Sequence, residues 1–223
     1  MLCAIMFKVF APSEPAYNPA HCYQQSTDSN CGYYCLRIAA EYFLGDKFEK
    51  ASRGIFTRDF LPMCPRSGQR LEFSTKQFEE LFPDLDIHFE TDNKPDYSPA
   101  DVLEKLAEGK ILVLNLQNIK FVGNKMKAYT RAKGAKRGVE GHNICCIGGD
   151  EEKLIFSDSN RSGKSCRKTM QTDILQAGYE AVHGLTLNPR DRAIAKTTFI
   201  CEMFWVVAGP PKKTPLRRSR RRR

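Results

Sequence analysis

The sequence predicts an α+β fold in which a helical N-terminal half packs on a C-terminal antiparallel β-sheet. Before about residue 108, apolar residues recur mainly at three- and four-residue spacing, which is the period of amphipathic helices. After that point they form short apolar runs of strand length. We expect one folded domain over residues 1–208, followed at 209–223 by a disordered basic tail rich in Pro and Arg.

The first predicted helix begins at Cys31. Apolar residues recur at helical spacing from Cys35 onward, and Ser29 or Asn30 can cap the free backbone amides of the first turn. Gly45 is expected to end this helix, because glycine readily adopts the left-handed conformation that follows a helix C-terminus. Cys31 therefore lies in the first turn.

Two further helices and four strands are predicted after this helix. Helices are expected over residues 75–82 and 100–107, and Ser98-Pro99 supply a cap and a first-turn proline for the second. The candidate strands are 111–116, 143–147, 153–157 and 199–207.

Cys31 is the candidate nucleophile. The partial positive charge at a helix N-terminus favours thiolate over thiol, and the thiolate is the form that attacks a carbonyl carbon. Gln25 precedes Cys31 by six residues and offers a side-chain amide that can donate to an oxyanion. The alternative interpretation is that Cys31 is one more buried apolar residue, which is the usual environment of a free cysteine.

A thiol nucleophile needs an imidazole base, and the chain has four histidines that could supply it. His21, His88 and His183 lie in sequence surroundings that suggest no such role. His142 follows Gly141 and opens an apolar run, so it is the candidate base. The alternative is a structural histidine at the start of a strand.

Asp158 is the candidate partner of His142. The predicted strands 143–147 and 153–157 are joined by the turn Gly148-Gly149-Asp150, and antiparallel pairing brings the start of the first beside the end of the second. The Asp158 carboxylate would then hold the imidazole in the tautomer that a base requires. The alternative is that Asp158 is an ordinary turn residue.

These residues resemble the papain-like cysteine hydrolases, and most closely the branch of the bacteriocin-processing (C39-like) peptidases and their stand-alone relatives. The resemblance rests on Gln25 six residues before Cys31, on the segment Asn30-Cys31-Gly32, on Gly141-His142 before an apolar strand, and on Asp158 sixteen residues after His142. It implies a papain-like fold. It also implies roles for four residues: Cys31 as nucleophile, His142 as general base and then acid, Asp158 as the group that orients His142, and Gln25 as an oxyanion-hole donor.

The sequence departs from this group after the aspartate. A proline usually follows it there, whereas Ser159-Asn160 follows here, so Asn160 is an alternative orienting residue. The resemblance implies a cysteine-dependent amide hydrolase, a protease or peptidase, that acts on protein or peptide substrates without a cofactor. A protein-glutamine deamidase with the same triad is the alternative, because the outcome depends on which carbonyl the cleft admits.

Positive charge is concentrated in two segments. The formal net charge is +9, and residues 212–223 contain lysines and arginines but no acid. This tail could be a nuclear-localisation segment, a tether to nucleic acid or an anionic membrane, or a solvated tail. The basic, glycine-containing segment 117–139 is expected to be a flexible loop beside the active site that either selects an acidic substrate or is merely solvated. A further alternative is a catalytically silent module that binds nucleic acid or an anionic membrane.

The nine cysteines are odd in number and irregularly spaced, which favours a reducing, intracellular compartment over a disulfide scaffold. The apolar residues 1–10 are expected to form a strand rather than a signal peptide, because they lack early basic residues and a small-residue cleavage site. No apolar run reaches the ~20 residues needed to cross a bilayer.

A zinc site is not expected. The adjacent Cys145 and Cys146 would point to opposite faces of a strand, and the sequence has no paired Cys-x-x-Cys knuckles. Cys35, one turn after Cys31, is expected to be a core residue.

Overall fold

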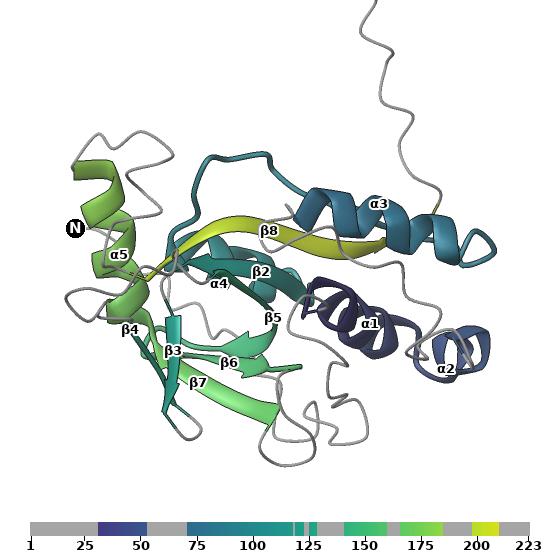
Figure 1. The fold of residues 1–223 in the computed structure, drawn as a ribbon, viewed down its shortest axis with the longest axis horizontal. Coiled ribbons are helices and arrows are strands. Elements are labelled where there is room, and N and C mark those ends of the chain that lie inside the picture. The colour runs from purple at the N-terminus through teal and green to yellow at the C-terminus, as the bar shows by residue number, and fades with distance from the viewer. Residues whose placement is uncertain are drawn as a thin grey trace, which may run out of the picture.

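The computed structural model describes residues 31–52, 71–117, 119–122, 125–128, 141–159, 166–184 and 198–209, and the fold is stated for these residues (Figure 1). The elements in chain order are α1 (Cys31–Leu44), α2 (Asp46–Ser52), α3 (Leu71–Leu81), β1 (Ile87–Glu90), α4 (Pro99–Ala107), β2 (Leu112–Gln117), β3 (Ile119–Val122), β4 (Lys125–Ala128), β5 (Gly141–Gly149), β6 (Lys153–Ser157), β7 (Arg167–Gln171), α5 (Thr172–Gly184) and β8 (Phe199–Ala208).

The strands of the described part form one sheet, in the order β1-β8-β2-β5-β6-β7-β4-β3. The first six of these pair antiparallel with their neighbours, and so do β4 and β3. Only β4 and β7 run parallel, through the register pair Lys125 and Thr169. The predicted antiparallel sheet is confirmed apart from this contact.

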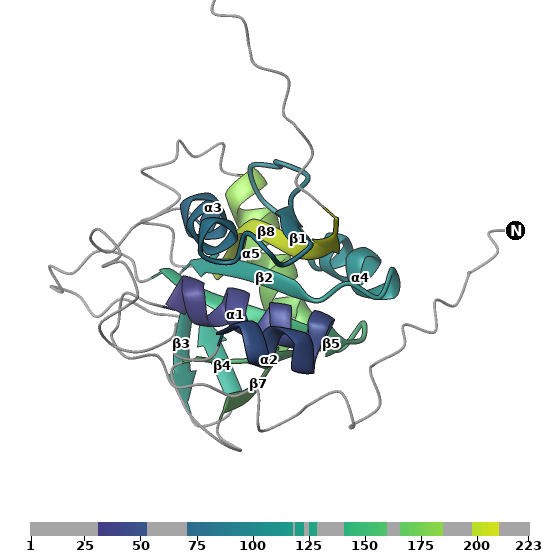
Figure 2. The same ribbon diagram turned by 90° about the vertical axis from the view of Figure 1, so that its right-hand side faces the viewer.

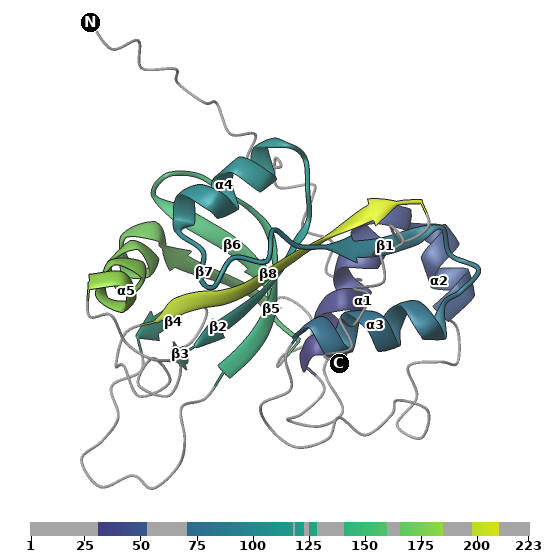
Figure 3. The same cartoon turned by 90° about the horizontal axis from the view of Figure 1, so that it is seen from above.

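Helices cover both faces of the sheet, because the central strands are apolar on both faces. Cys145 and Ile147 of β5 belong to the core cluster shared with α1, α2 and α3. Ile144 and Cys146 belong to the cluster shared with α4 and α5. Figure 3 shows α1–α3 grouped on one side and α4 and α5 on the other. The predicted α+β class is therefore confirmed.

The helix that begins at Cys31 has the predicted bounds. Gly45 follows it at a φ of 55°, and the Gly45 amide donates to the Glu41 carbonyl at 2.8 Å. Glycine adopts this left-handed conformation without a steric penalty, so the chain can turn directly into α2. Nearly every residue of α1 from Cys31 to Ala40 is buried, because this helix lies between the sheet and the neighbouring helices.

Helices α3 and α4 begin with two different kinds of cap. Predicted over 100–107, α4 begins at Pro99, after Ser98 forms a capping box with Asp101. Helix α3 begins at Leu71, earlier than the predicted residue 75. Its first backbone amide donates to the Glu202 carboxylate at 3.0 Å, so a carboxylate from β8 stabilises this end of the helix.

Several elements of the structure were not predicted from the sequence. Among them are α5 and β7 in the second half of the chain, and the short strand β1, which precedes α4 and ends the sheet. Helix α5 packs closely on the start of β8, where a Cβ atom at Gly178 would lie 1.7 Å from the Thr198 carbonyl oxygen. A glycine inside this helix therefore permits the close packing.

The interpretation of residues 117–139 as a flexible loop is wrong for the part that the structure describes. Residues 119–122 and 125–128 form β3 and β4, which pair antiparallel through Val122 and Lys125. The Gly123-Asn124 dipeptide between them is a sequence typical of a tight hairpin. The predicted turn at 148–150 also shifts, because β5 continues through Gly149.

Several predictions fall outside the described residues. They concern the strand at 1–10, the caps Ser29 and Asn30, and the tail at 210–223. Within the described residues, no helix is long and apolar enough to cross a membrane.

Candidate active site

Three predicted residues come from three neighbouring elements. Cys31 is the first residue of α1, His142 is the second residue of β5, and Asp158 directly follows β6. Helix α1 packs along β5, and β5 pairs with β6, so the two contacts bring these chain segments together (Figure 2). All three side chains are buried, and Cys31 and His142 each retain 8% exposure.

His142 and Asp158 are in direct contact. The His142 Nε2 atom lies 2.8 Å from Asp158 Oδ1, as the predicted hairpin geometry requires. The β5–β6 register places Cys145 opposite Ser157, so Asp158 continues past the last paired residue toward the start of β5. Since Nε2 faces Asp158, the other ring nitrogen, Nδ1, is left for a second partner.

The backbone of Asp158 is fixed by Cys166. The Asp158 amide donates to the Cys166 carbonyl at 2.9 Å, and the Cys166 thiol donates to the Asp158 carbonyl at 3.1 Å. Both residues are fully buried. The carboxylate that contacts His142 is therefore held by a contact from the residue immediately before β7.

Cys31 is hydrogen bonded to the His142 side chain. Burial alone raises the pKa of the Cys31 thiol, but the hydrogen bond and charge of His142, together with hydrogen bonds from Asn143, lower it below its usual value. The Nδ2 atom of Asn143 lies 3.5 Å from the Cys31 sulfur. The site therefore favours the thiolate form of Cys31.

The pKa of His142 shifts in the complementary direction. Burial lowers it, whereas the hydrogen bonds and charges of Asp158 and Cys31 raise it, and the result is a pKa of about 9. A lowered thiol pKa and a raised imidazole pKa are the two halves of a thiolate–imidazolium ion pair. This arrangement can supply both a nucleophile and a proton donor.

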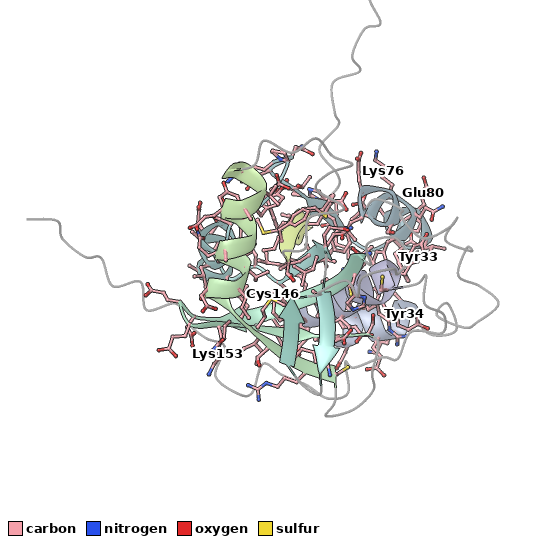
Figure 4. The ribbon with its side chains drawn as sticks, turned by 60° about the vertical axis from the view of Figure 1, so that its left-hand side comes forward. Tyr33, Tyr34, Lys76, Glu80, Cys146 and Lys153 are labelled. Atoms are coloured by element: carbon pink, nitrogen blue, oxygen red, sulfur yellow. The ribbon has the colours of Figure 1, made fainter. Side chains whose placement is uncertain are left out.

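Other cysteines of the described part have the opposite electrostatic environment. Burial raises the pKa of Cys35 well above its usual value, and the charges of Cys31, Cys145 and Asp158 raise it further. Burial also raises the pKa of Cys146 and Cys201 to about 12. Figure 4 shows Cys146 in the interior of the molecule, away from Lys153, which lies at the periphery. These thiols stay protonated, and the predicted core role of Cys35 is confirmed by its complete burial.

Gly32 allows the elements around Cys31 to approach closely. A Cβ atom at Gly32 would lie 3.0 Å from Ser74 Oγ of α3 and 3.2 Å from Asn143 Nδ2 of β5. A side chain here would push both groups away from the first turn of α1. The absence of a side chain at residue 32 therefore helps to keep the Asn143 amide near the Cys31 sulfur.

The other described histidines have structural partners. His88 Nδ1 lies 2.9 Å from the Gly209 carbonyl oxygen, and its Nε2 lies 3.3 Å from a Glu90 carboxylate oxygen. His183 Nε2 lies 3.7 Å from an Asp96 carboxylate oxygen. His21 lies outside the described residues, as do Gln25 and Asn160, so the oxyanion donor and the alternative orienting residue stay predictions.

The two cysteines of β5 lie on opposite faces of the sheet, as the strand alternation predicted. Cys145 and Cys146 belong to core clusters on opposite faces of the sheet, so the two sulfurs point apart. Among the described residues, no group of three or more His, Cys, Asp or Glu side chains is placed to hold a metal ion.

Asn143 and Cys166 were not among the site residues predicted from the sequence. Asn143 lies two residues before Cys145, so strand alternation places its side chain on the face of the sheet that α1 covers, where it reaches the sulfur. The position directly after the candidate base was the available signal. Cys166 acts through its backbone and through a thiol–carbonyl bond, which no sequence motif marks.

Comparisons with known proteins give limited information. No protein-family model matches the chain, and no curated protein matches it. Among solved structures, a crystal structure of a candidate C39-like peptidase from Bacillus anthracis matches 84% of this chain and 94% of that chain, with 11% identity and a TM-score of 0.39. A likeness at this level assigns no activity, so the functional conclusion depends on the geometry around Cys31, His142 and Asp158.

Proposed function

We propose that this protein is a cysteine-dependent amide hydrolase, a protease or peptidase, that acts on protein or peptide substrates. The observation that carries the proposal is the continuous set of contacts from Cys31 to His142 to Asp158. The thiol pKa is lowered and the imidazole pKa is raised to about 9, so these residues form a nucleophile and a proton carrier rather than three packed core groups.

The acylation step follows from these roles. The Cys31 thiolate attacks the amide carbonyl carbon, a carbon–sulfur bond forms, and the carbonyl electron pair moves to oxygen. The Cys31 backbone amide at the start of α1 and the Gln25 side chain would donate to this oxyanion. One such donor typically contributes about 3–4 kcal/mol.

His142 completes the reaction as acid and then as base. Its imidazolium donates a proton to the leaving nitrogen as the carbon–nitrogen bond breaks, which leaves a thioester on Cys31. The neutral imidazole then takes a proton from water, whose oxygen attacks the thioester and releases the acid product. Asp158 holds the ring through Nε2 at 2.8 Å, which directs Nδ1 toward the sulfur.

A papain-like fold of the C39-like branch fits this proposal. A helix that begins with the cysteine packs on an antiparallel sheet that carries the histidine and the aspartate, as the sequence resemblance implied. Asp158 contacts the imidazole directly, which supports it over Asn160 as the orienting residue.

Glutamine deamidation is the alternative use of the same residues. If the cleft admits a glutamine side chain, the leaving group is ammonia, and the thioester forms on the side-chain carbonyl. The contacts of Cys31, His142 and Asp158 are compatible with both reactions, because they act on the carbonyl and the leaving nitrogen alone.

Binding of an anionic partner is a second candidate function, and one observation favours it. Every charged residue on the strands β3, β4, β6 and β7 is basic: Lys120, Lys125, Lys127, Lys153, Arg167 and Lys168, of which Lys168 is buried. The basic tail at 212–223 carries the same sign of charge. Such a module would bind nucleic acid or an anionic membrane with a steep dependence on salt, and residues 212–223 would contribute to the binding.

Mass spectrometry of candidate protein substrates tests the proposed hydrolase. The wild-type chain should cleave a backbone amide, and Cys31→Ala should not. A mass gain of about one dalton on glutamine, with no cleavage, would assign the deamidase instead, because deamidation replaces the –NH2 of the side-chain amide by –OH. If iodoacetamide labels all accessible cysteines equally fast, the proposal of an activated thiol is wrong.

A further inference from the structure

Asn143 contacts α1 through both its side chain and its backbone. Its Nδ2 atom lies 3.5 Å from the Cys31 sulfur, and its backbone amide is also hydrogen bonded to Cys31. Its carbonyl oxygen accepts a hydrogen bond from the Cys35 thiol at 3.0 Å. One residue of β5 therefore holds two successive turns of the helix that carries the proposed nucleophile.

We propose that Asn143 is a positioning residue that holds the Cys31 sulfur as a thiolate, by donating to it with the side-chain amide. The inference rests on the proposed function, because it assigns a role within the same site. His142 supplies a hydrogen bond from a charged imidazolium, and Asn143 supplies hydrogen bonds from uncharged amides. The Asn143 hydrogen bonds thus stabilise the thiolate without taking part in the proton transfers of the reaction.

The orientation of the Asn143 amide supports this role. Its Oδ1 atom is buried and has no hydrogen-bond partner among the described residues. The side chain of the cross-strand partner Asn115 has other partners, because its Nδ2 donates to Glu202 at 2.9 Å and its Oδ1 accepts from Gln117 at 3.0 Å. A buried acceptor without a partner is unfavourable. The opposite orientation would place this oxygen against the thiolate, so the amide keeps its donor on the sulfur.

The surroundings hold the amide in this position. A Cβ atom at Gly32 would lie 3.2 Å from Asn143 Nδ2, so the amide packs directly against the backbone of α1. The titratable groups around the sulfur are His142 of β5, Cys35 of α1, and Asp158 behind His142. Asn143 is the uncharged donor among them, so its removal leaves the ion pair with His142 in place.

This role has a kinetic signature that a packing role lacks. A donor to the sulfur increases the thiolate fraction at neutral pH, but it also withdraws charge from the sulfur and makes each thiolate less nucleophilic. Loss of the donor should therefore move the pH–rate profile of alkylation to higher pH and raise its alkaline plateau. The profiles of the variant and the wild type should cross.

The experiment measures iodoacetamide alkylation of Cys31 by mass spectrometry from pH 5 to 11. For Asn143→Leu we expect the inflection to rise by about one pH unit, with a plateau raised about two- to threefold at a Brønsted coefficient of 0.4–0.5. The nearly isosteric Asn143→Asp should fold even if the leucine variant does not. It should shift the inflection further, because a carboxylate repels the thiolate.

Asn115→Leu is the matched control. It removes the same amide from the neighbouring strand, and Asn115 is hydrogen bonded to Glu202 and Gln117 rather than to Cys31, so its profile should coincide with that of the wild type. Unchanged inflections in both Asn143 variants, or an equal shift in Asn115→Leu, would overturn the proposal. Alkylation reports thiolate formation and not hydrolysis, so a chain that hydrolyses no amide would refute the proposed function while this measurement still decides the role of Asn143.

Discussion

The first and second turns of α1 each carry a cysteine, and the pKa values of the two thiols shift in opposite directions. Cys31 and Cys35 are both buried, and they lie one turn apart on the same helix. The pKa of Cys31 is lowered, whereas that of Cys35 is raised well above its usual value. Burial raises both values, so burial does not explain the difference.

Neighbouring charges and hydrogen bonds explain it, and the charges of Cys31, Cys145 and Asp158 raise the pKa of Cys35 beyond the effect of burial. Cys31 receives donors from His142 and Asn143, and these stabilise negative charge on its sulfur. Cys35 instead donates its own proton to the Asn143 carbonyl, a bond that needs the neutral thiol. The start of β5 thus presents donors to one cysteine and an acceptor to the next. A reactive thiol is distinguished here by what faces it and not by how exposed it is.

Removal of each thiol should give the largest contrast. Cys31→Ala should abolish hydrolysis and the fast phase of iodoacetamide labelling, because Cys35, the other cysteine of the pair, stays protonated. Cys35→Ala should keep most of the activity and lose about 1 kcal/mol of stability, as expected for a small core truncation. Kinetic assays and thermal unfolding of both variants check this. Equal loss of activity in the two would show that Cys35 is more than a core residue.

Replacement of Asp158 should have the next largest effect. Asp158→Asn removes the charge that stabilises the imidazolium, so the pKa of His142 should fall from about 9 toward its usual value. The alkaline limit of activity, where His142 loses the proton for the leaving group, should move to lower pH. We expect kcat to fall by about 10²–10⁴. The measurement is the pH profile of kcat.

Asn160→Ala is the control for Asp158→Asn, because Asn160 is the alternative orienting residue in the sequence. Its pH profile should keep the alkaline limit near pH 9, which is set by His142. If Asn160→Ala moves this limit and Asp158→Asn does not, the orienting role belongs to Asn160.

Gln25 should affect catalysis without affecting the thiol. Gln25→Ala should lower kcat by about 10²–10³, the typical loss for one oxyanion donor. Alkylation of Cys31 forms no oxyanion, so its rate should be unchanged. Gln24→Ala changes the adjacent residue of the same type and should leave both rates near those of the wild type. A loss of labelling in Gln25→Ala would instead indicate that this residue maintains the local fold.

Sequence was sufficient where the determining contacts are local. The β5–β6 hairpin joins His142 to Asp158 through a short connection, so alternating polarity and turn residues predict their meeting. The start and end of α1 follow likewise from spacing and from Gly45. Periodicity and turn chemistry act within about ten residues, and these features need no more than that.

Sequence was insufficient where distant segments decide the structure. Asn143 and Cys31 are separated by 112 positions, and the contact depends on the packing of α1 on β5. Helix α5 contains Gly178, and glycine has a low helix propensity. The glycine is explained only by the close approach of the Thr198 carbonyl, which the sequence does not reveal. Strand β7 is short and polar, and it pairs with β6 along its whole length. Partners across the sheet, and not local propensity, determine these elements.

Replacement of Cys166 should have the smallest effect on the site. It tests whether the difference between the Cys31 and Cys35 pKa values depends on the contact between Cys166 and Asp158. Cys166→Ala removes the thiol that donates to the Asp158 carbonyl at 3.1 Å but keeps the backbone bond at 2.9 Å. A neutral hydrogen bond contributes about 1 kcal/mol, so we expect kcat to fall about fivefold as Asp158 gains freedom. The matched control is Cys201→Ala, whose thiol donates to the Asn115 carbonyl at 3.4 Å.

Thermal unfolding and kcat, measured on both variants, separate stability from positioning. Both changes remove a thiol–carbonyl bond, and Cys201→Ala also removes the sulfur that accepts from Gln117 Nε2 at 3.5 Å, so its loss of unfolding free energy should be at least as large. Only Cys166→Ala should lower kcat, because only Cys166 holds the residue that contacts His142. Equal kcat values in the two variants would mean that the backbone bond alone fixes Asp158. The electrostatic difference between Cys31 and Cys35 would then depend on contacts within α1, β5 and Asp158 alone.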